Sequence, residues 1–107
     1  MKTNPEYLEF VMERLSPIGD VKSRAMFGGY GIFNEGLMFA LIAKDTLYFK
    51  VNESNRDMYK SARSKPFPHG ISYWEVPSDV LEDDTKLHQW ATISIEIARE
   101  AAGKKRR

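Results

Sequence analysis

With 107 residues, no cysteine and a formal net charge of +1, the chain fits a single domain that folds without cross-links, and disulfide frameworks, thiol nucleophiles and zinc fingers are excluded. The first residues lack the apolar core of a signal peptide, and the longest apolar run, residues 37–43, is far shorter than the roughly 20 residues that cross a bilayer. We therefore expect a cytoplasmic protein without a membrane partner.

The first predicted element is a helix near the N-terminus. Thr3 and Glu6 have the spacing of a capping box, and Pro5 suits the first turn because its missing N–H leaves no helical bond unmade. Apolar residues then recur at helical spacing as far as Leu15. Pro17 ends this pattern.

A meander of up to four strands follows the first helix. Residues 21–26 alternate like a partly exposed strand, and 30–33 and 37–43 flank a tight turn at Asn34-Glu35-Gly36. Residues 47–51 form the next strand. Strict alternation in the strand 37–43 places apolar residues on both faces, so we expect it to lie centrally and to be covered on both sides.

Two further helices and one strand complete the predicted fold. A short helix, capped by Asn52 or Ser54, runs through about residue 62, and residues 71–76 form a final strand. A long helix begins at Asp83 or Asp84 and stops at Gly103. Its apolar arc covers roughly 200°, twice that of a surface helix, so it needs cover from the first helix and the sheet or from a second copy of the chain.

These elements predict an α+β fold over residues 1–103, in which an antiparallel sheet of about five strands, a meander of four plus one, carries the N-terminal, middle and long C-terminal helices. Residues 104–107 are all basic and are predicted to be a disordered tail, which leaves the preceding body with a net charge of −3. Trp74 and Trp90 are expected to anchor the core.

The glycine-rich segment consists of Phe27, Gly28, Gly29, Tyr30 and Gly31. Glycines of this kind can let backbone N–H groups surround an anion, but the G-x-G-x-x-G spacing and the P-loop lysine are absent. We favour a structural motif, in which glycine supplies a positive φ or a close approach between strands at a bend.

Asp84 and His88 share one face of the long helix, but a metal needs at least one more ligand, and we favour Asp83 and Asp84 as helix caps. No signature of nucleophilic catalysis is present. We therefore predict that the protein is not an enzyme and has no catalytic residues, metal or cofactor.

Several segments in collinear order carry a family resemblance: 26–33 (MFGGYGIF), 36–42 (GLMFALI), 47–51 (LYFKV), 73–77 (YWEVP) and Trp90-Ala91. With these segments the chain resembles the N-terminal domain of the TfoX/Sxy family. The resemblance implies an antiparallel sheet with packed helices, and an association with bacterial regulators of natural competence that activate transcription without a known catalytic activity. Those regulators carry a second, helical domain, and here we expect a stand-alone N-terminal domain.

We therefore predict a non-enzymatic regulatory or adaptor domain that acts through protein contacts, with a homodimer as one candidate assembly. One alternative is a small-ligand-binding domain. The other is a nucleic-acid-binding protein whose basic residues contact phosphates: Arg56, Lys60, Arg63, Lys104, Lys105, Arg106 and Arg107. We favour a solvated helix face and a solubilising tail for these residues.

Overall fold

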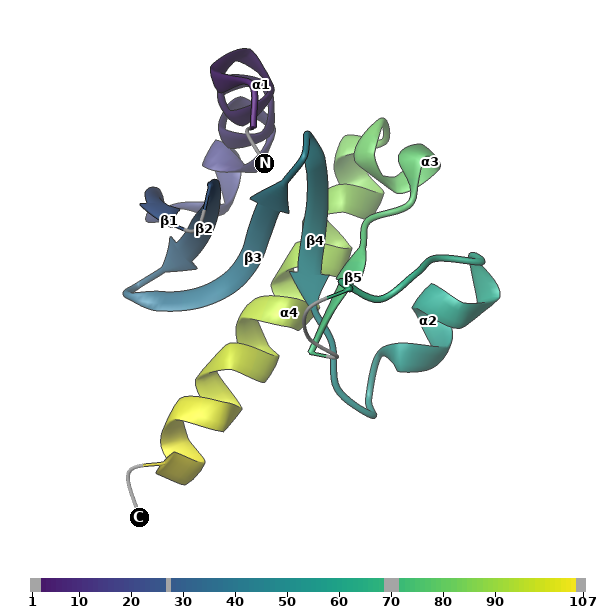
Figure 1. Cartoon of the computed structure of the whole chain (residues 1–107). Coiled ribbons are helices and arrows are strands. Elements are labelled where there is room, and N and C mark those ends of the chain that lie inside the picture. The colour runs from purple at the N-terminus through teal and green to yellow at the C-terminus, as the bar shows by residue number, and fades with distance from the viewer. Residues whose placement is uncertain (1–2, 27, 69–71, 106–107) are drawn as a thin grey trace.

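One antiparallel sheet organises the chain, with its strands in the order β1-β2-β3-β4-β5 (Figure 1). The structure is a computed structural model and describes residues 3–26, 28–68 and 72–105. Its elements are α1 (Pro5–Leu15), the short 3-10 helix η1 (Ser16–Ile18), β1 (Val21–Met26), β2 (Gly29–Asn34), β3 (Leu37–Ala43), β4 (Thr46–Lys50), α2 (Arg56–Ser61), β5 (Tyr73–Glu75), α3 (Ser78–Leu81) and α4 (Asp84–Lys105). The predicted α+β fold, with its five-stranded antiparallel sheet and three main helices, is confirmed.

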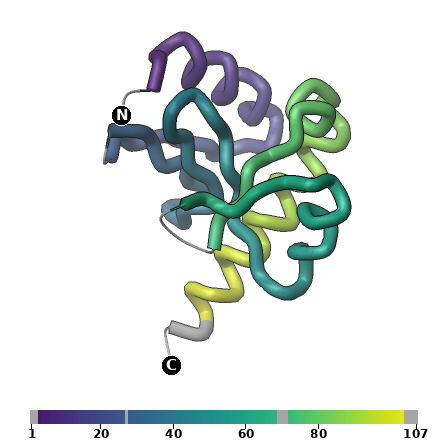
Figure 2. Tube along the Cα trace, turned by 45° about the vertical axis from the view of Figure 1, so that its right-hand side comes forward, coloured from purple at the N-terminus to yellow at the C-terminus, as the bar shows by residue number. Residues whose placement is uncertain are grey.

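The helices gather on one face of the sheet. The long helix α4 runs behind β3 and β4, and α1 lies beside its first half (Figures 1 and 2). Each of the four α-helices contributes to one buried cluster, represented by Val11, Tyr59, Val80 and Leu87. The sheet and the other helices cover most of the apolar arc of α4, while Trp90 and Ile93 on one side of the helix stay half-buried.

A β-bulge in β3 overturns part of the prediction for that strand. Ile32 of β2 pairs with Ala40, whereas the next residue, Phe33, pairs with Met38, so Phe39 is the extra residue. Phe39 and Ala40 are both fully buried, which strict alternation forbids. The strand is central as predicted, but its second face is not covered by any described helix.

Two of the hairpins close through turns in which both central residues have a positive φ, the pattern of a type I′ turn. Glu35 and Gly36 have φ values of 50° and 81°, and Lys44 and Asp45 have values of 51° and 57°. The second turn contains no glycine. It is tied to the N-terminus because the Asp45 carboxylate accepts a hydrogen bond from the backbone N–H of Asn4 at 2.7 Å.

Several predicted boundaries are corrected. Asn4, not Thr3, caps α1, since its side-chain oxygen accepts from the Glu6 N–H at 2.9 Å, while Thr3 is buried. The helix α4 continues through Gly103 to Lys105; Gly103 is exposed, and a glycine in a last turn costs little. The helix α3 was not predicted.

The two edges of the sheet differ. β1 is an edge strand with mostly exposed residues. β5 is flanked instead by the preceding loop, where the N–H of Phe67 donates to Tyr73 at 2.8 Å and the N–H of Glu75 donates to Lys65 at 2.9 Å. The predicted final strand 71–76 is therefore shortened to Tyr73–Glu75 and gains a neighbour; residue 71 lies outside the described residues.

Candidate interaction surface

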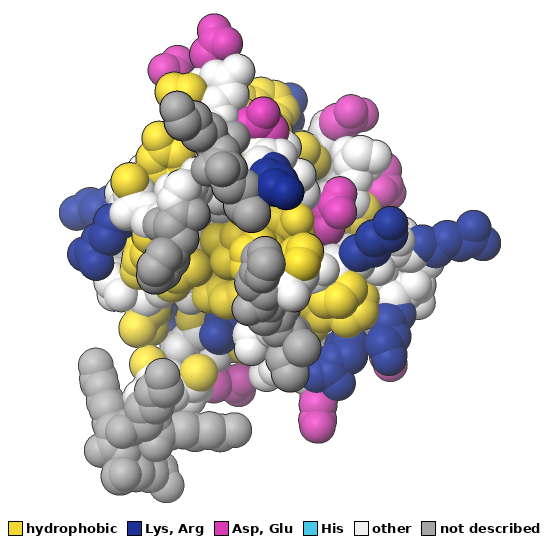
Figure 3. Space-filling view, viewed as in Figure 1, with side chains coloured by type: hydrophobic (Ala, Val, Ile, Leu, Met, Phe, Trp, Pro, Cys, Tyr) yellow, Lys and Arg dark blue, Asp and Glu magenta, His cyan; other side chains and the backbone are white. Residues whose placement is uncertain are grey.

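The face of the sheet that turns away from the helices is the candidate functional surface. Register and alternation place six apolar or aromatic side chains there, and we call this set the open face: Met26, Phe33, Met38, Leu41, Tyr48 and Tyr73. All six are half-buried, and none belongs to the core cluster or packs against it. Figure 3 shows hydrophobic side chains gathered at the centre of this view, over the strands.

Cations accompany the rings of the open face. The guanidinium carbon of Arg24 lies 5.4 Å from the centroid of the Phe33 ring, and the ammonium of Lys50 lies 5.2 Å from that of Tyr73. Such cation–π contacts hold a charge beside an apolar surface. The carboxylate of Glu75, on β5 at the opposite edge of the same face from Arg24, supplies a negative charge.

The tyrosines of the open face are held in their neutral form. Burial raises the pKa of Tyr73 to about 12. The pKa of Tyr48 is also raised, first by burial and then by the negative charge of Glu75. The ring of Tyr48 packs edge-on against Phe67, with 5.0 Å between centroids. These phenols therefore offer apolar rings with hydrogen-bonding ends at neutral pH.

The glycine-rich segment forms the tight connection between β1 and β2, beside the open face. Gly28 has a φ of +80°. A Cβ on Gly29 would lie 2.1 Å from the carbonyl oxygen of Ile42, so only glycine fits this close approach of strands. Tyr30 pairs with Ala25 and is half-buried, and the ends of Met26 and Phe33 lie over Gly31. The φ of Gly28 and the close approach at Gly29 are the two demands on glycine that the structural interpretation expects; Phe27 lies outside the described residues.

The two tryptophans pack at the rim of the core rather than at its centre. Both are half-buried against the core cluster. The ring between them is Tyr59, which is fully buried and lies 4.7 Å from Trp90 and 6.4 Å from Trp74, measured between centroids. Trp74 and Trp90 thus join α2, β5 and α4 on the covered face.

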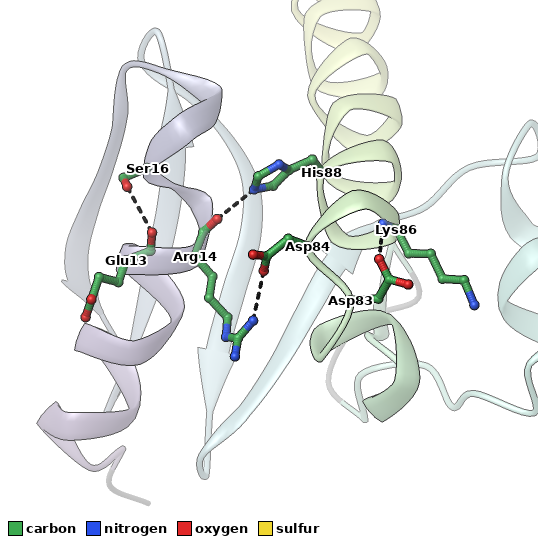
Figure 4. Close-up of polar contacts among 7 residues, drawn as sticks. All are labelled: Glu13, Arg14, Ser16, Asp83, Asp84, Lys86 and His88. Atoms are coloured by element: carbon green, nitrogen blue, oxygen red, sulfur yellow. Dashed lines mark hydrogen bonds and ion pairs between the residues drawn. The ribbon is translucent and has the colours of Figure 1, made fainter.

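Asp84 and His88 hold α1 against α4 (Figure 4). The Arg14 guanidinium lies 2.9 Å from the Asp84 carboxylate, and His88 Nε2 lies 2.7 Å from the Arg14 carbonyl oxygen, an acceptor to which it donates. Asp83 caps α4 by accepting from the Lys86 N–H at 3.1 Å, as predicted. Within the described residues no three histidines or carboxylates meet in a group able to hold a metal.

The basic residues of the nucleic-acid alternative that the structure describes lie on separate parts of the fold. Arg56 is half-buried and Lys60 exposed on α2, whereas Arg63 lies beyond the end of that helix. Lys104 and Lys105 belong to the last turn of α4, which lies far from α2 in Figures 1 and 2. Arg106 and Arg107 lie outside the described residues.

Sequence reasoning missed the open face because it assigned the apolar residues of β3 by strict alternation. That assignment expected both faces of the strand to be covered, whereas Phe39 and Ala40 are completely buried and Met38 and Leu41 on the other face are half-buried. The prediction that β1 is partly exposed is confirmed, but Ser23 and Ala25 on its other side are exposed as well. No helix among the described residues is long and apolar enough to pass through a membrane.

Two comparisons with known proteins bear on this surface. A comparison with curated proteins gives no match. A family model described as the TfoX N-terminal domain matches residues 13–98, which span the sheet from β1 to β5 and most of α4. The matched region therefore contains every residue of the open face.

Proposed function

This chain belongs to the TfoX N-terminal domain family, and from that premise we propose that it is a non-enzymatic regulatory or adaptor domain that acts in the cytoplasm by binding protein. The proposed regulation concerns transcription, in line with the resemblance to regulators of natural competence. The proposed contact surface is the open face.

One observation carries the proposal: an apolar sheet face lies outside the core that the helices complete. Phe49 and Tyr48 are neighbours in β4, but Phe49 is fully buried while Tyr48 is half-buried and packs outside the core cluster. An apolar surface that lies outside the core cluster, and that charged residues border, is typical of a protein contact. The proposal does not require a catalytic step.

Site-specific photo-crosslinking tests the proposal. A photo-reactive phenylalanine analogue at position 48, in the full chain expressed in bacterial cells, is expected to form covalent adducts with protein, identified by mass spectrometry. The same analogue at Glu96, exposed on α4, serves as the control, and Leu41→Asp in the position-48 chain should abolish the adducts. Protein adducts that are absent at position 48, or equally frequent at Glu96, would contradict the proposal.

A second candidate function is nucleic-acid binding through α2, because Lys and Arg side chains gather over that helix in Figure 3. Binding of this kind should weaken steeply with salt as counterions are released. A fluorescent oligonucleotide titrated at two salt concentrations, with Lys60→Ala as the variant, measures it; retention of binding in the variant at low salt would argue against this surface.

A further inference from the structure

A single row of paired residues crosses all five strands and carries opposite charges at its two ends. In strand order the row consists of Arg24, Gly31, Leu41, Tyr48 and Glu75. Because directly paired residues of antiparallel strands share a face, all five lie on the side of the open face. Arg24 and Glu75 are both exposed.

The two charged ends of this row have no ion pair within the described residues. The three ion pairs there are Arg14 with Asp84, Lys86 with Asp79 and Arg99 with Glu35. Four strand spacings of about 4.8 Å separate Arg24 from Glu75, about 19 Å in all, which is too far for contact in one chain. The row thus has a positive and a negative end, each available to a partner.

We propose that the open face binds the open face of a second copy of this chain, related by a two-fold axis that runs parallel to the strands above β3. Rotation about this axis places β1 of one copy over β5 of the other. Arg24 then meets Glu75 of the second copy, and the same contact forms a second time by symmetry. The inference rests on the proposed function, since it names the protein that the open face binds.

The polarity of the row selects this axis. A two-fold axis along the row itself would keep each strand over its own copy, so that Arg24 would face Arg24 and Glu75 would face Glu75. Like charges in close contact are disfavoured. Only the axis parallel to the strands brings both opposite charges together, and it also aligns the two sheets as in a β-sandwich.

The middle of the row is suited to the same arrangement. Leu41 meets Leu41 of the second copy on the axis, and the Tyr48 ring faces the position of Gly31. A Cβ built on Gly31 would lie 3.0 Å from the Met26 methyl and 3.1 Å from its sulfur, so the thioether already covers this glycine. A flexible thioether adapts to an aromatic ring and makes favourable sulfur contacts with it.

The size of the face sets the expected affinity. Five strands and about five residues along each strand cover roughly 24 Å by 17 Å, about 400 Å² on each copy, which is about half the area per partner of a standard interface and in the range of weak, transient contacts. We therefore expect a dissociation constant in the micromolar range, so that dimers form at laboratory concentrations and dissociate on dilution.

Sedimentation analysis of the full chain from about 1 µM to about 500 µM tests the proposal with charge reversals. The wild-type protein is expected to dimerise, and Arg24→Glu and Glu75→Arg should each weaken dimerisation at least about tenfold. Lys60→Glu and Glu53→Arg, matched reversals at exposed positions off the open face, should not. Unchanged circular dichroism and melting temperature establish that the variants fold.

Mixing the two variants gives the sharper result. A copy with Arg24→Glu and a copy with Glu75→Arg again place opposite charges together at both contacts, so the mixture should form a heterodimer although each variant alone is monomeric. A wild-type monomer across the whole range, variants that dimerise normally, or a mixture that stays monomeric would each overturn the proposal.

The outcomes separate this inference from the proposed function. A monomeric chain whose position 48 still crosslinks to a different protein overturns the second copy but leaves the protein-binding function intact. A monomeric chain that binds a single-stranded oligonucleotide, and loses that binding with Tyr48→Ala, overturns both, since the open face would then be a platform for stacked bases.

Discussion

The two faces of one sheet show how the same strands serve two purposes. On the covered face, Phe49, Phe39 and Ile42 pack against α4 with almost no exposure. On the open face, rings and thioethers are half-buried, stay outside the core cluster, and stand beside cations. Both faces of the sheet carry apolar side chains, but only the face that the helices cover forms the core. Apolar character alone therefore does not identify the core.

The largest expected effect is the difference in stability between alanine substitutions at two adjacent residues of β4. Phe49→Ala should lower the free energy of unfolding by about 3–5 kcal/mol, since it leaves a cavity in a close-packed core. Tyr48→Ala should cost less than about 1 kcal/mol in the monomer. Urea denaturation at low protein concentration measures both, and equal losses would mean that the open face belongs to the core.

A second contrast compares two glycines of β2. Gly29→Ala should destabilise the fold by about 1–3 kcal/mol, because its Cβ would collide with the backbone of β3. Gly31→Ala should cost less, because its Cβ meets the movable ends of Met26 and Phe33. Thermal melts of the two variants decide the order; a larger loss for Gly31→Ala would contradict it.

Alkaline pH should act on both faces through their tyrosines. Burial raises the pKa of Tyr59 on the covered face and raises that of Tyr73 on the open face to about 12. Because the folded state favours the neutral phenols, their contribution is complete below about pH 10. The contribution of Tyr73 is lost as the pH rises through 12.

The free energy of unfolding of Tyr73→Phe should therefore fall less than that of the wild type above about pH 10. The difference should be about 1 kcal/mol, since solvent partly screens the phenol. Urea denaturation at several pH values measures the slope. An unchanged slope in Tyr73→Phe would show that its phenol is solvated.

The smallest expected effect is that of a substitution in the turn that joins β3 to β4. Such a substitution changes neither face of the sheet. Lys44 has a φ of 51°, a conformation that asparagine adopts more readily than lysine. Lys44→Asn should stabilise the fold by about 0.5 kcal/mol. Lys65→Asn is the control, and a thermal shift of the same size in both would remove the turn as the cause.

Much of the fold followed from the sequence, but the open face did not. Helical periodicity in α1 and α4 and alternation in β1 predicted those elements because each pattern extends over several residues. The bulge at Phe39 is a shift of one residue, which a local pattern does not record. The four-residue helix α3 is too short to show a helical period.

The charged row could not be predicted from the sequence either. The sequence shows that Arg24 and Glu75 are charged, but it does not show that they lie in one row across the sheet. Their relation depends on four successive strand pairings, and an error of one residue in any of them would move one charge to the other face. The glycine-rich segment could be interpreted correctly because positive φ and close approach are local demands on a residue.

The loop at 65–67 that runs along β5 has a consequence for aggregation. Its hydrogen bonds occupy the outer edge of β5, so a sheet cannot be extended from that side by another chain without first displacing the loop. If two molecules pair through their β1 strands, their sheets are joined at the one edge that each molecule has available. No further molecule can then be added at a sheet edge. Fibril growth by repeated edge addition therefore stops at a pair, and the alternating Lys22 and Arg24 make even that pairing electrostatically unfavourable.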